Sequence, residues 1–371
     1  MNNKVWSKAK ANDWYDHMPW LRGCNYMPPE CPNRIDMWQT LNFERNMKSM
    51  ELDFALMQKI GFNSIRVILE FIVWDQEHDS FMTNFERFLA LAAKYGIQVM
   101  VCFANDCDRA RYNYPRKALG PQQYEIGYHG GKKPLSENEN LSGYPFRYYP
   151  ELDDPETAER FYAMVREIVG KYAADPRICV WDLYNEPGIL GKNDVSVPHV
   201  KRIFKEARKC ETIQPMTSCI WWTMDQAQAC ALELSDVISY HNYRNYESNI
   251  DEIAELRQYG RPLFNTEWLN RNVGNSIQEM FPLFYLEKIS CWNWGFTAGV
   301  YQTYEPPYGA FTSLKLGERR FDFEYTKWMH DLFRAGTRYP YDPNEIAIIM
   351  KYCKMSDAKE PLCEYSGWEK K

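Results

Sequence analysis

The sequence lacks the patterns that would place the protein in a membrane or on a nucleic acid. No apolar run is long enough for a transmembrane helix, and residues 1–7 do not open a signal-peptide core. We therefore expect a cytoplasmic protein with no membrane partner, unless an export signal has been trimmed from the chain. The 44 Lys and Arg residues are interspersed with 50 Asp and Glu residues, which leaves no basic patch to displace phosphate counterions. We expect no nucleic-acid partner.

The cysteines do not form the pattern of a zinc site either. The 11 Cys residues are scattered, and most lie in apolar runs such as 101–103 and 178–180. No tight pair of cysteines is matched by a second pair or by a pair of histidines, as a structural zinc site would require. We interpret the cysteines as buried, reduced thiols that act as small hydrophobic residues.

Aromatic residues, in contrast, are abundant. They make up 16% of the chain and include 13 Trp and 26 Tyr. Such side chains can simply fill a large core. They are also what a sugar-binding cleft requires, because an aromatic face packs against the C–H face of a pyranose while polar neighbours bind its hydroxyls.

Short apolar runs alternate with amphipathic helical patterns along most of the chain. Phe85, Phe88, Leu89 and Ala92 form one helical stripe, and Asp154-Pro155 is typical of the start of another helix. Further helices are expected around Leu52–Ile60, around 200–210 and, as the last one, around 325–333. The runs that we interpret as buried strands are 21–25, 64–69, 97–103, 178–184, 216–220, 236–240, 262–265 and 289–294.

Eight strand–helix units predict an α/β fold, the (β/α)8 TIM barrel, which takes about 250 residues and more with insertions. A doubly wound open sheet is the alternative, but the first strand–helix turn has no glycine-rich phosphate fingerprint. We expect one catalytic domain over 1–371, with a C-terminal tail, 341–371, packed on the barrel. The long insertion 105–150, rich in Tyr, Gly and Pro, is expected to form an ordered wall over the barrel mouth.

Chemistry in such a barrel takes place at the C-terminal ends of the strands, so the residues that follow each run are candidates for the site. Two of these residues are carboxylates, Glu186 and Glu267. Amide, imidazole, phenol and indole side chains accompany them. The candidate substrate-binding residues are Arg66, Asn105, Asn185, His241, Tyr243 and Trp294.

Two carboxylates at strand ends are the equipment for breaking a glycosidic bond. The leaving oxygen must be protonated as it departs, and the cation-like anomeric carbon needs an ionised carboxylate facing it. Pro187 is expected to hold Glu186 in extended backbone, and Tyr243 and Arg66 are expected to donate to Glu267. Asn185 is placed to bind the sugar hydroxyl next to the anomeric carbon. Neither a metal ion nor an organic cofactor is needed.

Asn185-Glu186-Pro187, Thr266-Glu267-Trp268, His241-Asn242-Tyr243 and the run 289–294 resemble motifs of the clan A glycoside hydrolases, most of all family 5, the cellulase and mannanase family. The resemblance implies that Glu186 is the acid/base, that Glu267 is the nucleophile and that the anomeric configuration is retained. It also implies that His241 and Tyr243 bind substrate and support the nucleophile, and that Trp294 is a sugar platform. Many members of the family carry a His near the end of strand three, where this chain reads Cys102-Phe103-Ala104-Asn105.

The sequence thus predicts a retaining β-glycosidase that hydrolyses β-linked oligosaccharides by double displacement, acting on chain ends or on short oligosaccharides. An endo-acting β-glucanase or β-mannanase is the nearer alternative, and a barrel that binds carbohydrate without cleaving it is the more distant one. Two residues also have structural readings. Arg66 could instead be a structural residue that closes the floor of the barrel, and His241 could instead be a buried histidine of the core.

Overall fold

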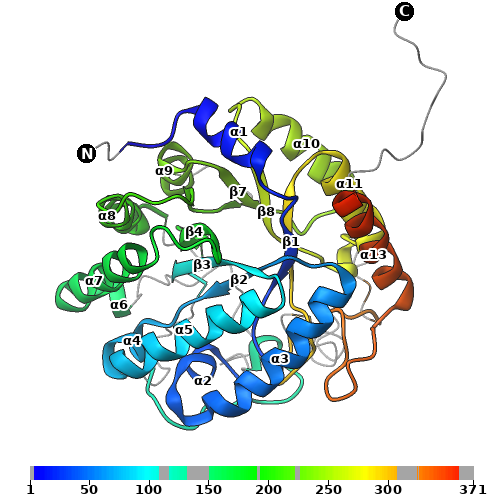
Figure 1. Ribbon diagram of the computed structural model, residues 1–371, viewed down its shortest axis with the longest axis horizontal. Coiled ribbons are helices and arrows are strands. Elements are labelled where there is room, and N and C mark those ends of the chain that lie inside the picture. Colours follow the sequence, from blue (N-terminus) through cyan, green and yellow to red (C-terminus); the bar gives the residue numbers. More distant parts are fainter. Residues whose placement is uncertain are drawn as a thin grey trace, which may run out of the picture.

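A parallel β-sheet lies at the centre of the molecule and helices surround it (Figure 1). The computed structural model describes residues 4–107, 117–131, 150–189, 193–221, 226–306, 324 and 326–358. The strands in this part of the chain are β1 (Arg22–Asn25), β2 (Ser64–Ile68), β3 (Gln98–Asn105), β4 (Ile178–Asn185), β5 (Met216–Thr217), β6 (Ile220–Trp221), β7 (Ile238–His241), β8 (Leu263–Trp268) and β9 (Ser290–Trp294).

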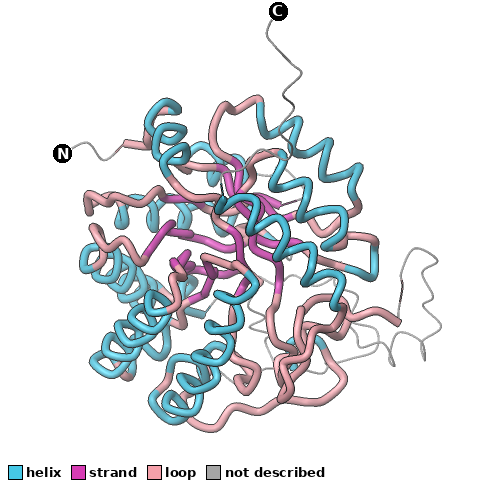
Figure 2. Tube along the Cα trace, turned by 45° about the vertical axis from the view of Figure 1, so that its right-hand side comes forward, coloured by secondary structure: helices cyan, strands magenta, loops and turns pink. Residues whose placement is uncertain are grey.

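The helices form the outer layer, as the view in Figure 2 also shows. They are α1 (Lys8–His17), α2 (Arg34–Trp38), α3 (Phe43–Ile60), α4 (Phe71–Gln76), α5 (His78–Lys94), α6 (Pro150–Asp153), α7 (Pro155–Lys171), α8 (Val197–Ala207), α9 (Gln226–Leu234), α10 (Tyr246–Arg257), α11 (Ile277–Leu286) and α13 (Pro343–Ala358). Short 3₁₀ turns are η1 (Thr40–Asn42), η2 (His129–Gly131), η4 (Asn193–Ser196) and η5 (Arg271–Val273). None of the described helices is both long enough and apolar enough to cross a bilayer.

The strand order is β5-β4-β3-β2-β1-β9-β8-β7-β6, with every neighbouring pair parallel. The two outer strands, β5 and β6, both come from the predicted fifth strand, 216–220. The sheet therefore curls until its two edges are separated by only Ser218 and Cys219. The predicted (β/α)8 barrel is confirmed.

The predicted fifth strand is divided because its middle residues bond to the end of β4. Ser218 Oγ donates to the carbonyl of Tyr184 at 2.8 Å, and the backbone N–H of Glu186 donates to Cys219 Sγ at 2.9 Å. These side-chain bonds take the place of ladder pairing at 218–219. The interruption thus lies beside Glu186, one of the two candidate carboxylates.

The helix predicted around 325–333 is wrong for its described residues, 326–333, which form bends and an isolated β-bridge at Phe333 rather than a helix. Arg271 binds the carbonyls of Trp328, His330 and Asp331, and those groups are then not available to a helical ladder. The eighth barrel helix is α13, in the segment predicted to be a tail, and it packs against α3 and α11. Residues 359–371 lie outside the described part.

Other helix predictions hold with one adjustment. α5 buries Phe85, Phe88, Leu89 and Ala92, and Asp154 caps α7 by accepting from Thr157 N at 2.8 Å. The helix predicted around Leu52–Ile60 is α3, which begins earlier, at Phe43. Leu52 is 56% exposed, whereas Met50, Phe54, Met57 and Ile60 are buried.

A small apolar cluster closes the end of the barrel where the strands begin. It contains Leu21, Met100, Cys179, Val180, Val237, Phe264 and Trp292. Trp14 and Tyr15 of α1 pack on this cluster, and so does Met18, which directly follows α1. Because this end is filled with side chains, only the C-terminal ends of the strands are left for a site.

Gly23 provides a test of barrel closure. A Cβ atom on Gly23 would lie 1.6 Å from the backbone oxygen of Ser64 in the neighbouring strand. We expect Gly23→Ala to lower the free energy of unfolding by about 3 kcal/mol, because β1 and β2 must separate. The thermal midpoint at a fixed heating rate measures this loss.

Gly170→Ala is the matched control, because this glycine lies inside α7 and its Cβ would meet only Cys210 Sγ, at 3.3 Å. Alanine in a helix interior is favoured over glycine by about 1 kcal/mol, so the midpoint should stay or rise. Equal midpoints for Gly23→Ala and wild type would contradict the close β1–β2 contact.

Candidate active site

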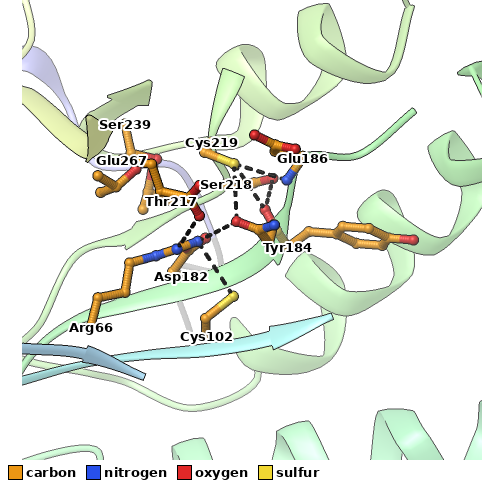
Figure 3. A network of polar contacts seen from close by, with 12 residues as sticks. Arg66, Cys102, Asp182, Tyr184, Glu186, Thr217, Ser218, Cys219, Ser239 and Glu267 are labelled. Atoms are coloured by element: carbon orange, nitrogen blue, oxygen red, sulfur yellow. Dashed lines mark hydrogen bonds and ion pairs between the residues drawn. The ribbon is translucent and has the colours of Figure 1, made fainter. Parts of the chain in front are cut away.

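Arg66, in β2, lies at the centre of the site and is 1% exposed. Its Nη2 is 2.7 Å from Asp182 Oδ2, and its Nη1 is 2.8 Å from Glu267 Oε1. The same guanidinium donates to Asn25 Oδ1 at 2.8 Å and to Asn185 Oδ1 at 2.6 Å. Burial by itself lowers the pKa of Arg66, but the carboxylates of Asp182 and Glu267 raise it well above its usual value, so the guanidinium stays charged. Figure 3 shows Arg66 and Asp182 in this network.

Glu267, in β8, is bound through both carboxylate oxygens. Oε1 accepts from Arg66 Nη1, and Oε2 accepts from the Tyr243 hydroxyl at 2.8 Å. Burial raises the pKa of Glu267, while the charge of Arg66 and the hydroxyl of Tyr243 act in the opposite direction. The predicted contacts of Arg66 and Tyr243 with Glu267 are confirmed.

Glu186 does not have the extended backbone that the following proline predicts. Its φ is +44°, in the left-handed region, which a non-glycine residue occupies at a cost of about 1–3 kcal/mol. Two bonds hold this turn: the Glu186 N–H donates to Cys219 Sγ, and the Gly188 N–H donates to Asp106 Oδ2 at 2.8 Å. The prediction from Pro187 was wrong because tertiary contacts override the local preference of a residue before proline.

The side chain of Glu186 is bound by two neutral groups. His241 Nδ1 lies 2.6 Å from Oε1, and Cys107 Sγ donates to Oε2 at 2.7 Å. Burial lowers the pKa of His241 to about 4, so the imidazole is neutral near pH 7. Burial also raises the pKa of Glu186. The two carboxylates therefore differ, because Glu267 touches a cation and Glu186 touches an imidazole and a thiol.

The two carboxylates are close to one another. One oxygen of Glu186, one oxygen of Glu267 and one nitrogen of His241 all lie within 4.8 Å of each other. By distance alone these three residues could hold a metal ion. The guanidinium on Glu267 Oε1 and the hydroxyl on its Oε2 argue against a cation there, because they already balance the charge and bind both oxygens.

The predicted asparagines lie side by side but are not equivalent. Asn185 is bound to Arg66, and its Nδ2 donates to Asn105 Oδ1 at 2.8 Å. Asn105 also accepts from the backbone N–H of Cys107 at 3.0 Å. Asn105 thus contacts other residues of the site rather than either carboxylate.

Trp294 and Trp292 lie on one side of β9 at different depths. Trp292 is 0% exposed in the cluster at the closed end of the barrel, whereas Trp294 is half-buried. Trp294 and Arg66 line a cavity, which reaches Glu267 through Arg66. The cavity is also lined by residues that follow β1 and β9, among them Met27, Pro29 and Phe296, so it opens at the C-terminal ends of the strands. Glu186 and Glu267 are not among its lining residues.

The insertion 105–150 is described over 105–107, 117–131 and Pro150, and Tyr112, Tyr114, Tyr144, Phe146, Tyr148 and Tyr149 lie outside the described residues. The middle part, 117–131, is hydrogen-bonded to the segment that follows β9. Gln302 Oε1 accepts from the Gly127 N–H at 2.6 Å, and Gln302 Nε2 donates to the Glu125 carbonyl at 2.6 Å. Tyr124 lines a second groove, which shares Pro29 and Gly299 with the cavity.

Several residues of the network were not predicted from the sequence. Asp182 lies inside β4, where a polar residue at one buried position gives no periodic signal, whereas Asn25 ends β1 and could have been found by the strand-end rule. His330 packs on Tyr243 with ring centroids 5.4 Å apart, from a segment that was predicted to be helical. Asp106 and Cys107 directly follow Asn105, and the strand-end rule that selected Asn105 could have found both. The unpredicted residues are Asn25, Asp106, Cys107, Asp182, Cys219 and His330.

No protein-family model matches the sequence, and no curated protein matches it. Solved structures do match. An exo-β-1,4-mannosidase from Opitutaceae bacterium strain TAV5 aligns with a TM-score of 0.56 and 15% identity over 91% of this chain. This chain spans 60% of the length of that mannosidase structure.

Two further structures match over nearly their full length. A glycoside hydrolase family 5 mannosidase from Rhizomucor miehei has a TM-score of 0.53 and 14% identity over 92% of this chain and 94% of its own. A β-glucosidase designated 1317 has a TM-score of 0.53 and 13% identity over 93% and 99%. At these identities the likeness shows the fold. This chain has the α/β barrel found in family 5 glycoside hydrolases.

Replacing Arg66 tests its role as the charge that balances the site. Arg66→Met leaves Asp182 and Glu267 buried without a cation, and we expect a loss of about 3–5 kcal/mol in unfolding free energy near pH 7. Without the cation, the folded pKa of each carboxyl rises further above its unfolded value. The deficit relative to wild type is then smallest in acid, where both carboxyls are protonated, and it grows as the pH rises through the wild-type pKa values of Asp182 and Glu267, which burial already raises.

Arg160→Met is the control, because its pair with Asp75 is at the surface and should contribute no more than about 1 kcal/mol. Urea unfolding at several pH values compares the two variants. A pH-independent deficit in Arg66→Met would contradict the charge-balancing role.

Proposed function

We propose that this protein is a retaining β-glycosidase that hydrolyses β-linked oligosaccharides by double displacement. The observation that carries the proposal is the pairing of Glu186 and Glu267 at the ends of β4 and β8, with different charges around them. Glu267 contacts Arg66 at 2.8 Å, which favours the ionised form that a nucleophile needs. Glu186 contacts His241 and Cys107, and burial raises its pKa, which favours the protonated form that a general acid needs.

The separation of the carboxylates supports retention. Inverting enzymes hold their two carboxyl groups about 6.5–9.5 Å apart to admit a water molecule, and retaining enzymes about 5–5.5 Å. One oxygen of Glu186 and one oxygen of Glu267 lie within 4.8 Å of each other, a short separation that suits direct attack by Glu267 on the anomeric carbon. Glu186 then acts as acid in the first step and as base for water in the second.

The sugar that is cleaved off is proposed to bind in the cavity beside the carboxylates. Trp294 supplies an aromatic wall, and the buried Arg66 both lines the cavity and donates to Glu267. The similar structures include an exo-mannosidase, a mannosidase and a β-glucosidase, and they support the removal of terminal sugars. No particular sugar is assigned.

An endo-acting β-glucanase or β-mannanase is the second candidate. The observation in its favour is the groove lined by Tyr124 and Trp328, which adjoins the cavity through Pro29 and Gly299. A groove that continues from the cavity gives room for further sugar units of a longer chain. A barrel that only binds carbohydrate stays the most distant alternative, and the paired carboxylates argue against it.

Aryl β-glycosides test the two roles. We expect Glu267→Ala to abolish turnover of every glycoside. The turnover rate of Glu186→Ala should fall about 10²–10⁴-fold with poor leaving groups. It should fall much less with activated nitrophenyl glycosides, because their leaving groups need no proton. Azide should restore turnover to Glu186→Ala by attacking the glycosyl-enzyme without a base.

The stereochemistry of the first product is the check on retention, and NMR of the sugar formed early in the reaction should show the β-anomer. The α-anomer as the first product would overturn double displacement. Binding of oligosaccharides without release of any product would favour the carbohydrate-binding alternative.

Two aromatic variants distinguish the cavity from the groove. Trp294→Ala should raise the KM for aryl monosaccharides and for oligosaccharides alike by about tenfold or more. The estimate takes the stacking of a sugar ring on Trp294 to be worth about 1–3 kcal/mol, as for a nucleobase on an aromatic side chain. Tyr124→Ala should leave the aryl glycosides unchanged. If Tyr124→Ala raises the KM for oligosaccharides, and does so more for longer ones, the endo-acting alternative gains support.

A further inference from the structure

Cys107 is in direct contact with the proposed acid/base residue, and the proposed mechanism has not used it. It lies two residues past the end of β3, and its sulfur is 2.7 Å from Glu186 Oε2. Its position is determined by two further bonds. The Cys107 N–H donates to Asn105 Oδ1 at 3.0 Å, and Asn185 Nδ2 donates to Cys107 Sγ at 3.6 Å.

When Glu186 is ionised, the proton in its hydrogen bond with Cys107 is bound to the sulfur. Burial raises the pKa of the Cys107 thiol well above its usual value, and the carboxylate of Glu186 raises it further. A thiolate and a carboxylate at this distance would be two like charges in a buried site. The thiol is therefore the donor, and the carboxylate oxygen is the acceptor.

The other oxygen of Glu186 is already bound to His241, so the thiol and the imidazole together determine the orientation of the carboxyl group. The backbone of Glu186 is held separately, by Cys219. Replacement of Cys107 should thus change the carboxyl group and leave the strained turn in place.

We propose that Cys107 is a positioning residue whose thiol donates to Glu186 Oε2, orients the acid/base carboxyl and stabilises its ionised form. The inference rests on the proposed function of Glu186. In the second step of double displacement Glu186 must be ionised to take a proton from water. A hydrogen bond to the ionised form keeps enough carboxylate available in an environment that otherwise favours the acid.

Other charged and titratable groups also face Glu186, and the test must hold them constant. They come from β2, β4, β7, β8 and the segments after β3, β5 and β7. These groups are Arg66, Asp182, His241, Glu267, Asp106, Cys219 and Tyr243.

The experiment compares Cys107→Ala, Cys107→Ser and the control Cys210→Ala. Cys210 has intermediate exposure, as Cys107 has, but it bonds to the Arg166 carbonyl, away from the site. Alanine removes a donor to the carboxylate, so the pKa of Glu186 should rise, by about one unit if the bond has the usual strength of a bond to a charged group. Serine should restore the wild-type value, because its hydroxyl is also a donor.

In kinetics, the alkaline limb of kcat/KM for a glycoside with a poor leaving group should move to higher pH in Cys107→Ala. With an activated aryl glycoside, turnover on the acid side should fall about tenfold, since the base form becomes scarcer. Cys210→Ala should match wild type. A loss that is independent of pH, or a loss that is the same in the Ala and Ser variants, would overturn the proposal in favour of simple packing.

A titration that needs no substrate separates this inference from the proposed function. The carboxyl resonances of protein labelled with [5-¹³C]glutamate are followed by NMR against pH, and Glu186→Gln identifies the resonance of Glu186. An upward shift in Cys107→Ala that is absent in Cys107→Ser supports the role of Cys107 even if no glycoside is hydrolysed. An unchanged titration in Cys107→Ala overturns it even if the enzyme is an active glycosidase.

Discussion

The positive charge of Arg66, in β2, is buried at the centre of the barrel, and three other strands supply the oxygens that it contacts. Asn25 comes from β1, Asp182 and Asn185 from β4, and Glu267 from β8. Burying an unpaired charge would cost many kcal/mol, so the guanidinium is tolerated only where these oxygens meet. The same requirement brings Glu267 to a defined place relative to Glu186. One buried ion pair network thereby joins the closure of the barrel to the arrangement of its carboxylates.

The environment of Glu186 differs from that of Glu267 in both charge and backbone geometry. Glu186 follows β4 in a left-handed conformation. Cys219 Sγ and Asp106 stabilise it by accepting hydrogen bonds from the backbone N–H groups of Glu186 and Gly188. Strain of this kind persists where surrounding contacts over-determine the backbone, and it is common at functional sites. The result is a carboxyl with neutral partners close to a carboxylate with a cationic partner. Burial raises the pKa of both side chains, but of the two it is Glu267 that accepts a hydrogen bond from the Arg66 guanidinium, which counteracts the rise.

The outer segments shape the space in front of these carboxylates. The segment after β9 is held by Arg271, which pairs with Glu345 of α13 and donates to three backbone carbonyls. Gln302 of the same segment fastens the described part of the insertion. The cavity beside Trp294 and the groove that adjoins it are therefore built from parts far apart in the sequence.

The sequence by itself determined the barrel and the position of the two carboxylates at strand ends, because apolar runs, helical stripes and strand-end residues are local patterns. The contacts of Arg66 and Tyr243 with Glu267 were also predicted, Arg66 from its place within the second strand and Tyr243 from its place after the sixth predicted strand. Only the tertiary structure decided the backbone of Glu186, the division of the strand at Ser218 and Cys219, and the helix α13 in place of 325–333. These features depend on bonds between residues far apart in the chain, such as Glu186 with Cys107 and Cys219, which leave no periodic signal. A proline or a helical stripe states a local preference, and a buried hydrogen bond from another strand is strong enough to override it.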